Sequence, residues 1–515
     1  MTTSGATRTA SRISSSGWRS SSPEAAEQEV WIVQRRAKIV ATIGPASASE
    51  KTLARLIRAG VNVVRLNQSH GTREEHRRLI RLVREVSEEA GRSVGVMVDL
   101  MGPRHRLDHF EGARVLKEGD VVGLGASAEA DLPLDRDMVR HVEPGEQILI
   151  DDGRVQLEVR SKDEERIEAE VIVGGAVSSR KGVNLPDSRL PFRISDKDLS
   201  DIRMAVEEDA DFLAASYVGT PADVVHVREA SREAGRPLQI IAKLERRRAL
   251  DHLDEIVLES DGVMVARGDL GVEIPLHQVP VVQKRIIESG WRHARPVIVA
   301  TQMLESMIEH PRPTRAESSD VANAVFDGAD AMMLSGESAA GRYPLEAVQT
   351  MHRIITESER YNLSKHTSQP VGFHTMEVGP YDIEPPHRPG TLEIPETVSA
   401  AAILSARHLT AQGIVVLSQG GFTARQVACR RPSTPVFAFT RESRSMRELQ
   451  LVWGVHSVKM DQEVYHHDEV VAMVDRQLLA GSLALPGDTI VLLMGDPIQD
   501  RPPTNLMRIH RVRPQ

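Results

Sequence analysis

The sequence predicts an α/β protein built on a closed barrel of parallel strands, with a β domain inserted into the barrel and a second α/β domain after it. Three observations lead to this prediction. Short apolar runs alternate with charged amphipathic segments from residue 38 onward. One connection between these runs is far longer than the others and has a β pattern of its own. A further series of apolar runs and helical patterns follows residue 395.

Eight apolar runs define the expected barrel. Near-continuous apolar strands separated by helices are typical of parallel sheets that are covered on both faces. Eight such strands, all but one followed by a helix of ordinary length, predict a (β/α)8 or TIM barrel. The expected strands are Lys38–Gly44, Asn62–Gln68, Gly95–Leu100, Asp211–Tyr217, Leu238–Glu245, Gly262–Gly268, Pro296–Gln302 and Ala331–Gly336.

The exceptional connection follows the third strand. Roughly ninety residues separate Leu100 from a helix start near Ser195, and no ordinary βα loop is that long. An inserted all-β domain above the barrel explains this length. Its expected strands are Asp120–Leu124, Gln147–Ile150, Val155–Arg160 and Ile167–Ile172, with turns at Glu118-Gly119 and Asp152-Gly153.

The remaining segments differ in composition. The first residues are rich in Ser, Thr, Arg and Ala without apolar periodicity, which predicts a disordered tail. The expected strands of the C-terminal α/β domain are Gly413–Ser418, Pro435–Thr440, His456–Met460 and Asp488–Met494. The predicted segments are 1–34 (tail), 35–107 (barrel, first part), 108–187 (insertion), 188–362 (barrel, second part), 363–395 (linker) and 396–515 (C-terminal domain).

Composition excludes several classes of protein. The 515-residue chain has a net charge of -9, whereas a nucleic-acid binder normally carries a basic field. The longest apolar stretches, such as Thr489–Met494, are too short to span a bilayer. The single cysteine, Cys429, cannot form an internal disulfide, which favours a reducing, cytoplasmic location.

Polar side chains stand where the second strand ends, and the C-terminal ends of barrel strands carry the chemistry of this fold. Arg65, Asn67 and Ser69 share one strand face because they are two residues apart. An arginine with two neutral oxygen donors suits a phosphate oxygen and a monovalent cation. The alternative is a core salt bridge with a capping Asn, which we favour less because the chain continues into a loop.

The fifth and sixth strands end in a lysine and two carboxylates. Lys243 and Glu245 share a face, and burying such a pair without a further partner would be costly. At the barrel mouth, the ammonium can hold a transferring phosphoryl group and the carboxylate a hard cation. Asp269 can supply a second carboxylate to the same cation, and Gly268 lets the backbone approach a small anion. Gly-Asp-Leu-Gly alone could be only a turn.

Other strand ends carry weaker signals. Thr301 and Ser335 are hydroxyls suited either to a proton relay or to helix capping, and for Ser335 the two readings are about equal. Asp99 ends the third strand beside the insertion. The returning segment Ser178–Asn184 is a basic, glycine-containing hinge that could place Lys181 over a nucleotide, although a lone basic pair is more often a solvated loop.

Several of these segments resemble pyruvate kinases. The resemblance rests on Ala37–Pro45, Asn62–Gly71, Lys181–Pro186, Val263–Pro275 and Ala300–Gly336. Its most specific part runs from Ala-Thr-Gln-Met-Leu-Glu-Ser-Met-Ile through Arg-Pro-Thr-Arg-Ala-Glu to Asp-Val-Ala-Asn-Ala-Val. Strong similarity covers Arg36 to Glu359, and a weaker match continues to Val512.

The resemblance implies both an activity and an organisation. It implies transfer of the phosphoryl group of phosphoenolpyruvate to ADP, giving pyruvate and ATP, as the last step of glycolysis. It also implies a β-barrel lid formed by the insertion, an effector function for the C-terminal domain, and a homotetramer.

The resemblance further implies roles for individual residues. Glu245 and Asp269 become the ligands of Mg²⁺ or Mn²⁺, and Lys243 becomes the phosphoryl-transfer lysine. Thr301 orders substrate and supports protonation of the enolate, and Ser335 joins the catalytic candidates. The implied substrate- and nucleotide-binding residues are Arg65, His70, Arg106, Lys181, Gly268, Asp269 and Thr301.

One departure from the family pattern concerns the monovalent cation. Potassium-dependent members resemble Asp-Thr-x-Gly-Pro-Glu after the third strand, whereas this chain has Leu100 and Arg104 at the Thr and Glu positions. This resembles the potassium-independent branch, in which a lysine supplies the charge. We hypothesise that the Arg104 guanidinium replaces the cation and makes K⁺ dispensable, although its usual ligands Asn67, Ser69 and Asp99 remain.

The effector loop is also unusual. The segment Ser418–Arg425 lines up with a region that holds a sugar phosphate in some members, but Gln419 and Phe422 stand where more polar or basic groups are common. The sequence does not identify the effector. Ser418, Thr423 and Arg425 remain candidate anion-binding residues.

Two other functions compete with the kinase. A lyase or aldolase could use the same Mg²⁺ site for enolate chemistry without a nucleotide, although the insertion with Lys181 argues against it. A non-catalytic paralogue of the kinase would be expected to lack catalytic residues. None of the five central candidates is missing: Arg65, Lys243, Glu245, Asp269 and Thr301.

Overall fold

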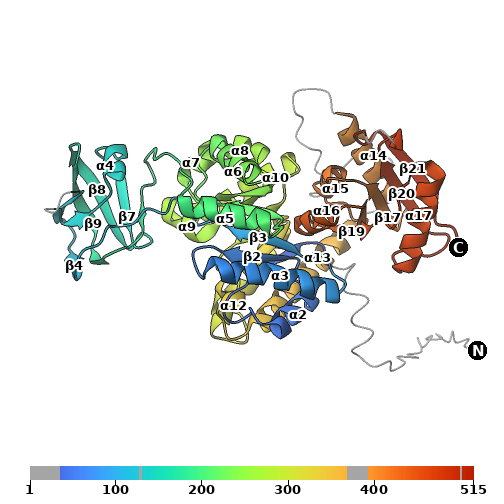
Figure 1. Cartoon of the computed structure of the whole chain (residues 1–515), viewed down its shortest axis with the longest axis horizontal. Helices are drawn as coiled ribbons and strands as arrows, with labels where there is room; N and C mark the ends of the chain where they lie inside the picture. Colours follow the sequence, from blue (N-terminus) through green and yellow to red (C-terminus); the bar gives the residue numbers. More distant parts are fainter. Residues whose placement is uncertain (1–34, 127–129, 368–392, 465, 499–501, 515) are drawn as a thin grey trace, which may run out of the picture.

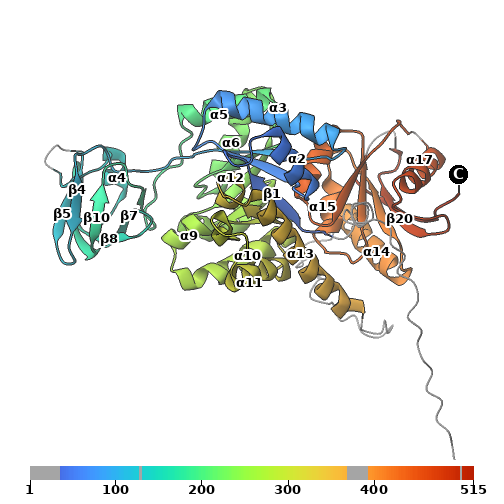
Figure 2. The same cartoon turned by 90° about the horizontal axis from the view of Figure 1, so that it is seen from below.

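The computed structural model describes residues 35–126, 130–367, 393–464, 466–498 and 502–514, with side chains of 364–367 excluded. Three parts lie in a row (Figures 1 and 2). The barrel occupies the middle, the inserted β part stands at one end, and the C-terminal α/β part lies at the other. Two chain segments connect the inserted part, which we call the lid, to the barrel.

The predicted barrel is confirmed. Its strands form one closed sheet in the order β1-β16-β15-β14-β13-β12-β3-β2, and all neighbouring pairs are parallel. Every strand lies inside one of the predicted apolar runs. The strands are β1 (Lys38–Thr42), β2 (Val63–Asn67), β3 (Gly95–Asp99), β12 (Phe212–Ala215), β13 (Gln239–Leu244), β14 (Gly262–Ala266), β15 (Val297–Ala300) and β16 (Ala331–Leu334).

Helices cover the outside of the barrel, and several begin at capping boxes that stop the preceding loop at a fixed residue. Thr72 and Glu75 cap one helix, and Ser195 with Asp198 caps the helix that follows the lid. The helices are α2 (Glu50–Arg58), α3 (Arg73–Glu89), α5 (Asp196–Glu207), α6 (Pro221–Glu233), α7 (Arg247–Asp251), α8 (Leu253–Glu259), α9 (Arg267–Glu273), α10 (Val279–Arg292), α11 (Arg315–Phe326), α12 (Gly336–Ala339) and α13 (Pro344–Thr367).

The lid has a hydrophobic core of its own. Its six-stranded sheet has the order β11-β7-β8-β9-β5-β6, and β10 pairs with β4. The predicted lid strands correspond to β5 (Val121–Gly125), β7 (Gln147–Ile150), β8 (Val155–Lys162) and β9 (Arg166–Val173). The sequence pattern did not indicate β4 (Ala113–Leu116), β6 (Leu132–Pro133), β10 (Gly175–Ser178), β11 (Val183–Asn184) or the helix α4 (Arg136–His141).

The C-terminal part is a five-stranded sheet in the order β19-β18-β17-β20-β21. Residues of α14 and α15 belong to one apolar cluster and residues of α17 to another, so helices cover both faces of the sheet. The strands are β17 (Gly413–Leu417), β18 (Val436–Thr440), β19 (Val455–Lys459), β20 (Thr489–Met494) and the antiparallel β21 (Leu506–Arg511). The helices are α14 (Ile394–His408), α15 (Phe422–Ala428), α16 (Ser443–Glu448) and α17 (His467–Ala480).

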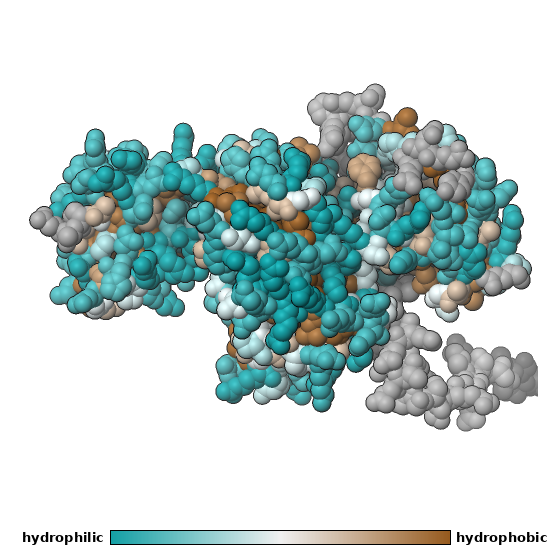
Figure 3. Space-filling model, viewed as in Figure 1, coloured by the Kyte–Doolittle hydropathy of each residue, from teal (hydrophilic) through white to brown (hydrophobic). Residues whose placement is uncertain are grey.

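The predicted tail and most of the predicted linker lie outside the described residues. Within the described ranges, no helix combines the length and apolar character needed to cross a membrane. The face of the molecule in Figure 3 is mainly hydrophilic, with smaller apolar areas.

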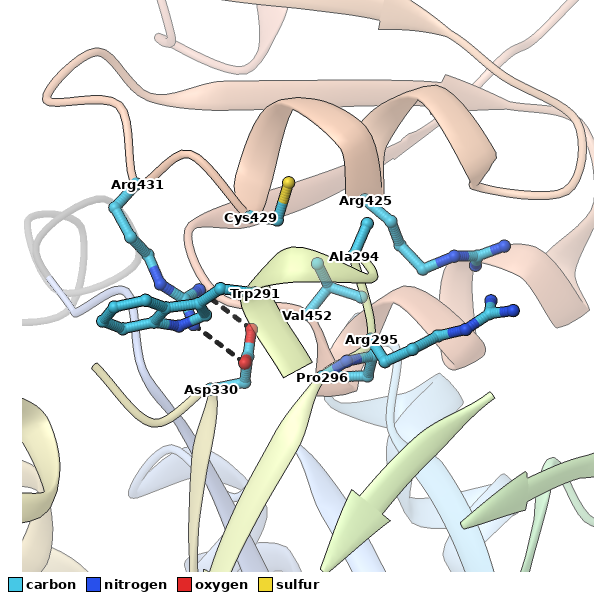
Figure 4. A pocket seen from close by; sticks show the side chains of 9 residues that line it. All are labelled: Trp291, Ala294, Arg295, Pro296, Asp330, Arg425, Cys429, Arg431 and Val452. Atoms are coloured by element: carbon cyan, nitrogen blue, oxygen red, sulfur yellow. Dashed lines mark hydrogen bonds and ion pairs between the residues drawn. The ribbon is translucent and has the colours of Figure 1, made fainter. Parts of the chain in front are cut away.

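An arginine joins the C-terminal part to the barrel (Figure 4). Arg431 donates to both carboxylate oxygens of Asp330, at 2.9 and 2.8 Å, just before β16 begins. Its guanidinium also lies over two tryptophan rings, 5.6 Å from the centroid of Trp291 and 5.0 Å from that of Trp453. A buried, bidentate and stacked arginine holds a fixed orientation. This contact therefore fixes α15 relative to the base of the barrel.

A histidine at this junction should make the protein sensitive to acid. Burial, with Lys38, Arg36 and Arg35 nearby, lowers the pKa of His456 to about 3. The unfolded chain takes up this proton near its ordinary pKa, so stability is lost as pH falls below about 6.5. Relative to His456→Leu, the wild type should lose at most about 2 kcal/mol between pH 7 and 5. Urea unfolding at the two pH values measures this difference.

The matched control is His310→Leu, which changes an exposed histidine. It should follow the wild type at both pH values. A parallel loss of stability in the wild type and His456→Leu would contradict the prediction.

Candidate active site

The strand ends at the barrel mouth bring most of the candidate residues together. Arg65 lies on β2, Asp99 ends β3, and Lys243 lies near the end of β13. Glu245 follows β13 directly, and Asp269 lies in the first turn of α9, which follows β14. The order of strands in the closed sheet thus collects residues that are far apart in the sequence.

Four of these side chains form an alternating line of charges, which we call the charged row: Arg65, Asp99, Lys243 and Glu245. Arg65 Nε lies 2.6 Å from Asp99 Oδ2. Lys243 Nζ lies 3.2 Å from Asp99 Oδ1 and 2.8 Å from Glu245 Oε1. All four residues are at least nine-tenths buried. Mutual pairing compensates the cost of burying these charges.

Neutral groups hold the charged row in place. Lys243 Nζ donates to Ser216 Oγ at 2.7 Å, and Ser216 Oγ donates to the Leu100 carbonyl at 2.8 Å. The Tyr217 N–H donates to Glu245 Oε2 at 2.7 Å. Ser216 and Tyr217 were not among the predicted site residues. Their place at the end of the predicted fourth strand was the signal that could have found them.

The environment shifts the proton affinities of the charged row. Burial alone would raise the pKa of Asp99, but Lys243 and Arg65 outweigh it and lower that pKa. Burial alone would lower the pKa of Lys243, but Asp99 and Glu245 raise it. Burial raises the pKa of Glu245 to about 7, with a further contribution from Asp269 and against the effect of Lys243. The lysine therefore stays protonated, and it offsets only part of the cost of burying the Glu245 carboxylate.

Glu245 and Asp269 form a set of donors that fits a hard divalent cation. Their carboxylates lie close enough for Asp269 to raise the pKa of Glu245, and a cation between them would remove this repulsion. Across the described chain, no three His, Cys, Asp or Glu side chains form a complete metal cage. Mg²⁺ typically binds one or two carboxylates and takes its other oxygens from water and phosphates.

Thr301 lies beside this carboxylate pair in a strained conformation. Its φ of 68° and the φ of 54° at Gln302 lie in the left-handed region, which is rare for a β-branched residue. Thr301 Oγ1 accepts a hydrogen bond from the Gly268 N–H at 2.8 Å and donates to the Ala300 carbonyl at 2.6 Å. Arg267 supports the turn by donating to the Thr301 carbonyl at 2.6 Å.

Ser335 occupies the N-cap position of α12, but its side chain makes no capping hydrogen bond. Its backbone N–H donates to Glu337 Oε2 at 2.7 Å. The Ser335 hydroxyl therefore does not cap α12 in this structure.

The expected cation-site residues are only partly gathered. Asp99 belongs to the charged row, and Leu100 is buried. Asn67 Oδ1 accepts from the Ser69 N–H at 3.1 Å. Arg104 is exposed on the segment that leads to the lid. Its backbone N–H donates a hydrogen bond to the Gly102 carbonyl.

The remaining substrate candidates lie on loops and on the lid. His70 is exposed, and its carbonyl contacts a ring nitrogen of His76 at 2.8 Å. Arg106 Nη1 donates to the Arg180 carbonyl at 2.9 Å. Lys181 Nζ lies 2.8 Å from Asp151 Oδ1, which ties it to the lid. The structure does not bring these three residues to the charged row.

A cavity of about 580 Å³ lies at the effector loop, and Ser418 and Thr423 line it. Its charged lining residues include Arg441, which pairs with Glu463 at 2.7 Å. Arg425 lines instead the small cavity at the junction with the barrel, where its side chain extends alongside that of Arg295 (Figure 4). The three effector candidates therefore do not converge on one cavity.

Comparisons with known proteins agree on one family. The family models for the pyruvate kinase barrel domain and alpha/beta domain match residues 34–348 and 396–510. Pyruvate kinase of Corynebacterium glutamicum is 41% identical over 491 residues, covering 93% of this chain and 98% of that protein. Pyruvate kinase of Mycobacterium tuberculosis is 40% identical over 490 residues, with the same coverage. The crystal structure of a pyruvate kinase from Cryptosporidium parvum has a TM-score of 0.82 and 33% identity, covering 93% of this chain and 96% of that one.

Proposed function

Because the chain belongs to the pyruvate kinase family and is therefore a phosphotransferase of glycolysis, we propose that the charged row is where it transfers the phosphoryl group of phosphoenolpyruvate to ADP. The supporting observation is the buried pairing of Lys243 with Asp99 and Glu245 at the barrel mouth. The comparisons favour this kinase over the lyase or aldolase and the non-catalytic paralogue.

Lys243 and Arg65 supply fixed positive charge to the transferring group. Lys243 Nζ is already held by Ser216 Oγ at 2.7 Å and by two carboxylates, so it needs little reorganisation when charge develops. Arg65 is oriented by Asp99 and by Thr42 Oγ1, to which its Nη1 donates at 3.0 Å. We assign to both the stabilisation of phosphoryl oxygens during in-line transfer.

Glu245 and Asp269 would hold Mg²⁺ or Mn²⁺, which when bound neutralises negative charge on the phosphoryl and enolate oxygens. Glu245 is held for this role by the Tyr217 N–H. The Gly268 N–H donates to Thr301 Oγ1 in this structure. We assign the N–H groups of Gly268 and Asp269 to binding of the substrate carboxylate. Thr301, with Ser335 as a second hydroxyl, is assigned to order substrate and support protonation of the enolate.

The lid supplies groups that the barrel lacks. Arg106 and Lys181 belong to the two segments that join it to the barrel, and we propose that closure brings both toward the phosphates, with His70 at the rim. Closure would also exclude water, which would otherwise hydrolyse the phosphoryl group.

We further propose that this enzyme does not need potassium. Asp99, the charged member of the expected cation site, already pairs with Arg65 and Lys243. Arg104 lies near enough to oppose the rise in the pKa of Tyr217 that burial, Glu245 and Asp269 cause. Its guanidinium can therefore add positive charge at the mouth.

In tetramethylammonium buffer free of Na⁺ and K⁺, added K⁺ should raise wild-type kcat by less than about threefold, because Arg104 supplies the charge. Arg104→Glu should become K⁺-dependent, because it replaces that charge with a carboxylate. Coupled assays across a K⁺ titration measure both effects. A large potassium activation of the wild type would refute the proposal.

We propose a cytoplasmic homotetramer. The apolar residues Ile394 and Leu404 on α14 and Ile509 on β21 are more than half exposed, as expected of a subunit contact. We retain Ser418 and Thr423 for an effector in the adjoining cavity. Light scattering of the purified chain measures the oligomeric state.

The proposed reaction is tested by its products. Purified protein with phosphoenolpyruvate, ADP and Mg²⁺ should form pyruvate and ATP in equal amounts, and EDTA should stop both. Pyruvate formed with release of inorganic phosphate and without ATP would mean that water, not ADP, accepts the phosphoryl group, and no product would favour the lyase or aldolase or the non-catalytic paralogue.

A further inference from the structure

Helix α9 carries one member of the carboxylate pair and contacts the lid. Asp269 lies in its first turn, and Glu273 is its last residue. Glu273 is 7% exposed, and its Oε1 accepts a hydrogen bond from Asn184 Nδ2 at 2.8 Å. Asn184 belongs to β11, on the chain segment that returns from the lid to the barrel. One helical turn therefore connects a lid contact to the carboxylate assigned to the metal.

A second lid segment lies beside the same end of the helix. At Gly153, a Cβ atom would lie 3.7 Å from Cγ1 of Val272, the residue before Glu273. The turn that contains Gly153 also carries Asp151, which pairs with Lys181 at 2.8 Å. The nucleotide-binding lysine of the lid is thus linked through this turn to the neighbourhood of α9.

Two charged side chains near this contact, Glu273 and Arg246, do not have all of their hydrogen bonds in good geometry. Glu273 Oε2 is buried and makes no hydrogen bond of good geometry, although Asn184, Arg246 and the Arg247 backbone N–H lie near enough to oppose the rise in the pKa of Glu273 that burial causes. Arg246, buried beside Glu245, reaches the carbonyls of Leu190 and Ser188 at only 3.5 and 3.4 Å. Such long contacts at a hinge leave room for a second arrangement when the lid moves.

We propose that the Asn184–Glu273 hydrogen bond couples the position of the lid to that of Asp269, which makes both residues positioning residues for phosphoryl transfer. The proposal rests on the metal role assigned above to Asp269. Neither Asn184 nor Glu273 has to touch substrate or metal. Their effect passes through the backbone of α9.

A double-mutant cycle tests this coupling. Asn184→Ala and Glu273→Ala should each lower kcat about tenfold and raise the half-saturating Mg²⁺ concentration about tenfold. The double variant should be no worse than the poorer single variant, because both substitutions remove the same bond. Glu273→Gln keeps an oxygen acceptor for Asn184 and should recover most of the activity. Its near-isosteric side chain also keeps the test valid if an alanine variant fails to fold.

The chain offers a matched control on the same hinge. Asp187 pairs with Arg247 at 2.7 Å across the lid–barrel boundary, but this side-chain pair is more exposed and both of its residues lie outside α9. Asp187→Ala should therefore remain within about twofold of the wild type in kcat and Mg²⁺ dependence.

Binding of Mn²⁺, followed by the electron paramagnetic resonance of the free ion, supplies a readout that does not depend on turnover. Asn184→Ala should weaken Mn²⁺ binding about tenfold, although Asn184 is not itself a metal ligand. Unchanged binding, or additive effects in the double variant, would overturn the coupling. Glu245→Gln in the same titration separates the two claims, because unchanged binding in that variant would overturn the metal site itself.

Discussion

Replacing Lys243 by methionine is expected to lower kcat by at least about a thousandfold. Lys243 Nζ is the central cation of the charged row, 3.2 Å from Asp99 and 2.8 Å from Glu245. Methionine keeps the volume of the side chain but supplies no charge to the transferring phosphoryl group. A coupled assay with saturating substrates and Mg²⁺ measures the loss, and circular dichroism checks that the barrel is folded.

The matched control for this variant is Lys284→Met. Lys284 also pairs with a carboxylate, that of Asp327, but it lies on α10 outside the mouth and its side chain is 55% exposed. Its replacement should leave kcat within about twofold of the wild type. A Lys243→Met variant with kcat within tenfold of the wild type would contradict the assignment of Lys243 to phosphoryl transfer.

Removal of one carboxylate from the metal pair should have the second largest effect. Glu245→Gln is expected to raise the half-saturating Mg²⁺ concentration about a hundredfold and to lower kcat, because the amide supplies no negative charge to the cation. The Gln carbonyl can still accept the hydrogen bond from Tyr217, so the loop should keep its shape. Activity titrated with Mg²⁺ measures the effect.

Asp269→Asn should act in the same direction, and Glu255→Gln, which changes an exposed carboxylate on α8, should not. An unchanged Mg²⁺ requirement in both Glu245→Gln and Asp269→Asn would mean that the cation binds elsewhere.

The barrel was predictable because its strands are buried on both faces. Every residue of β1 and of β14 is buried, so these strands read as unbroken apolar runs. The short lid strands were not predictable in this way. The strand β4 has two exposed residues among its four, and β11 has only two residues, so neither shows a pattern that distinguishes it from a loop.

The candidate site was predictable where it depends on single strands. Lys243 and Glu245 follow from the alternation of side chains on one strand. The partnership of Asp99 with Arg65 and Lys243 depends instead on the order and register of strands that are distant in sequence. Asp99 was expected as a ligand of a monovalent cation from the family resemblance, and no single strand could show that it also pairs with two cationic side chains.

The helix α15 shows another limit of sequence reasoning. Thr423 and Arg425 are two residues apart, and both were candidate anion-binding residues of the effector loop. In a helix such residues do not share a face. Thr423 lines the C-terminal cavity, and Arg425 lines the junction with the barrel.

A crystal structure with Mn²⁺ and phosphoenolpyruvate would test the central claim most directly, since the anomalous signal locates the metal. The metal should lie between Glu245 and Asp269, about 2.1 Å from a carboxylate oxygen of each. The phosphate should contact Lys243 Nζ. A metal peak away from both carboxylates, or a phosphate out of reach of Lys243, would contradict this account.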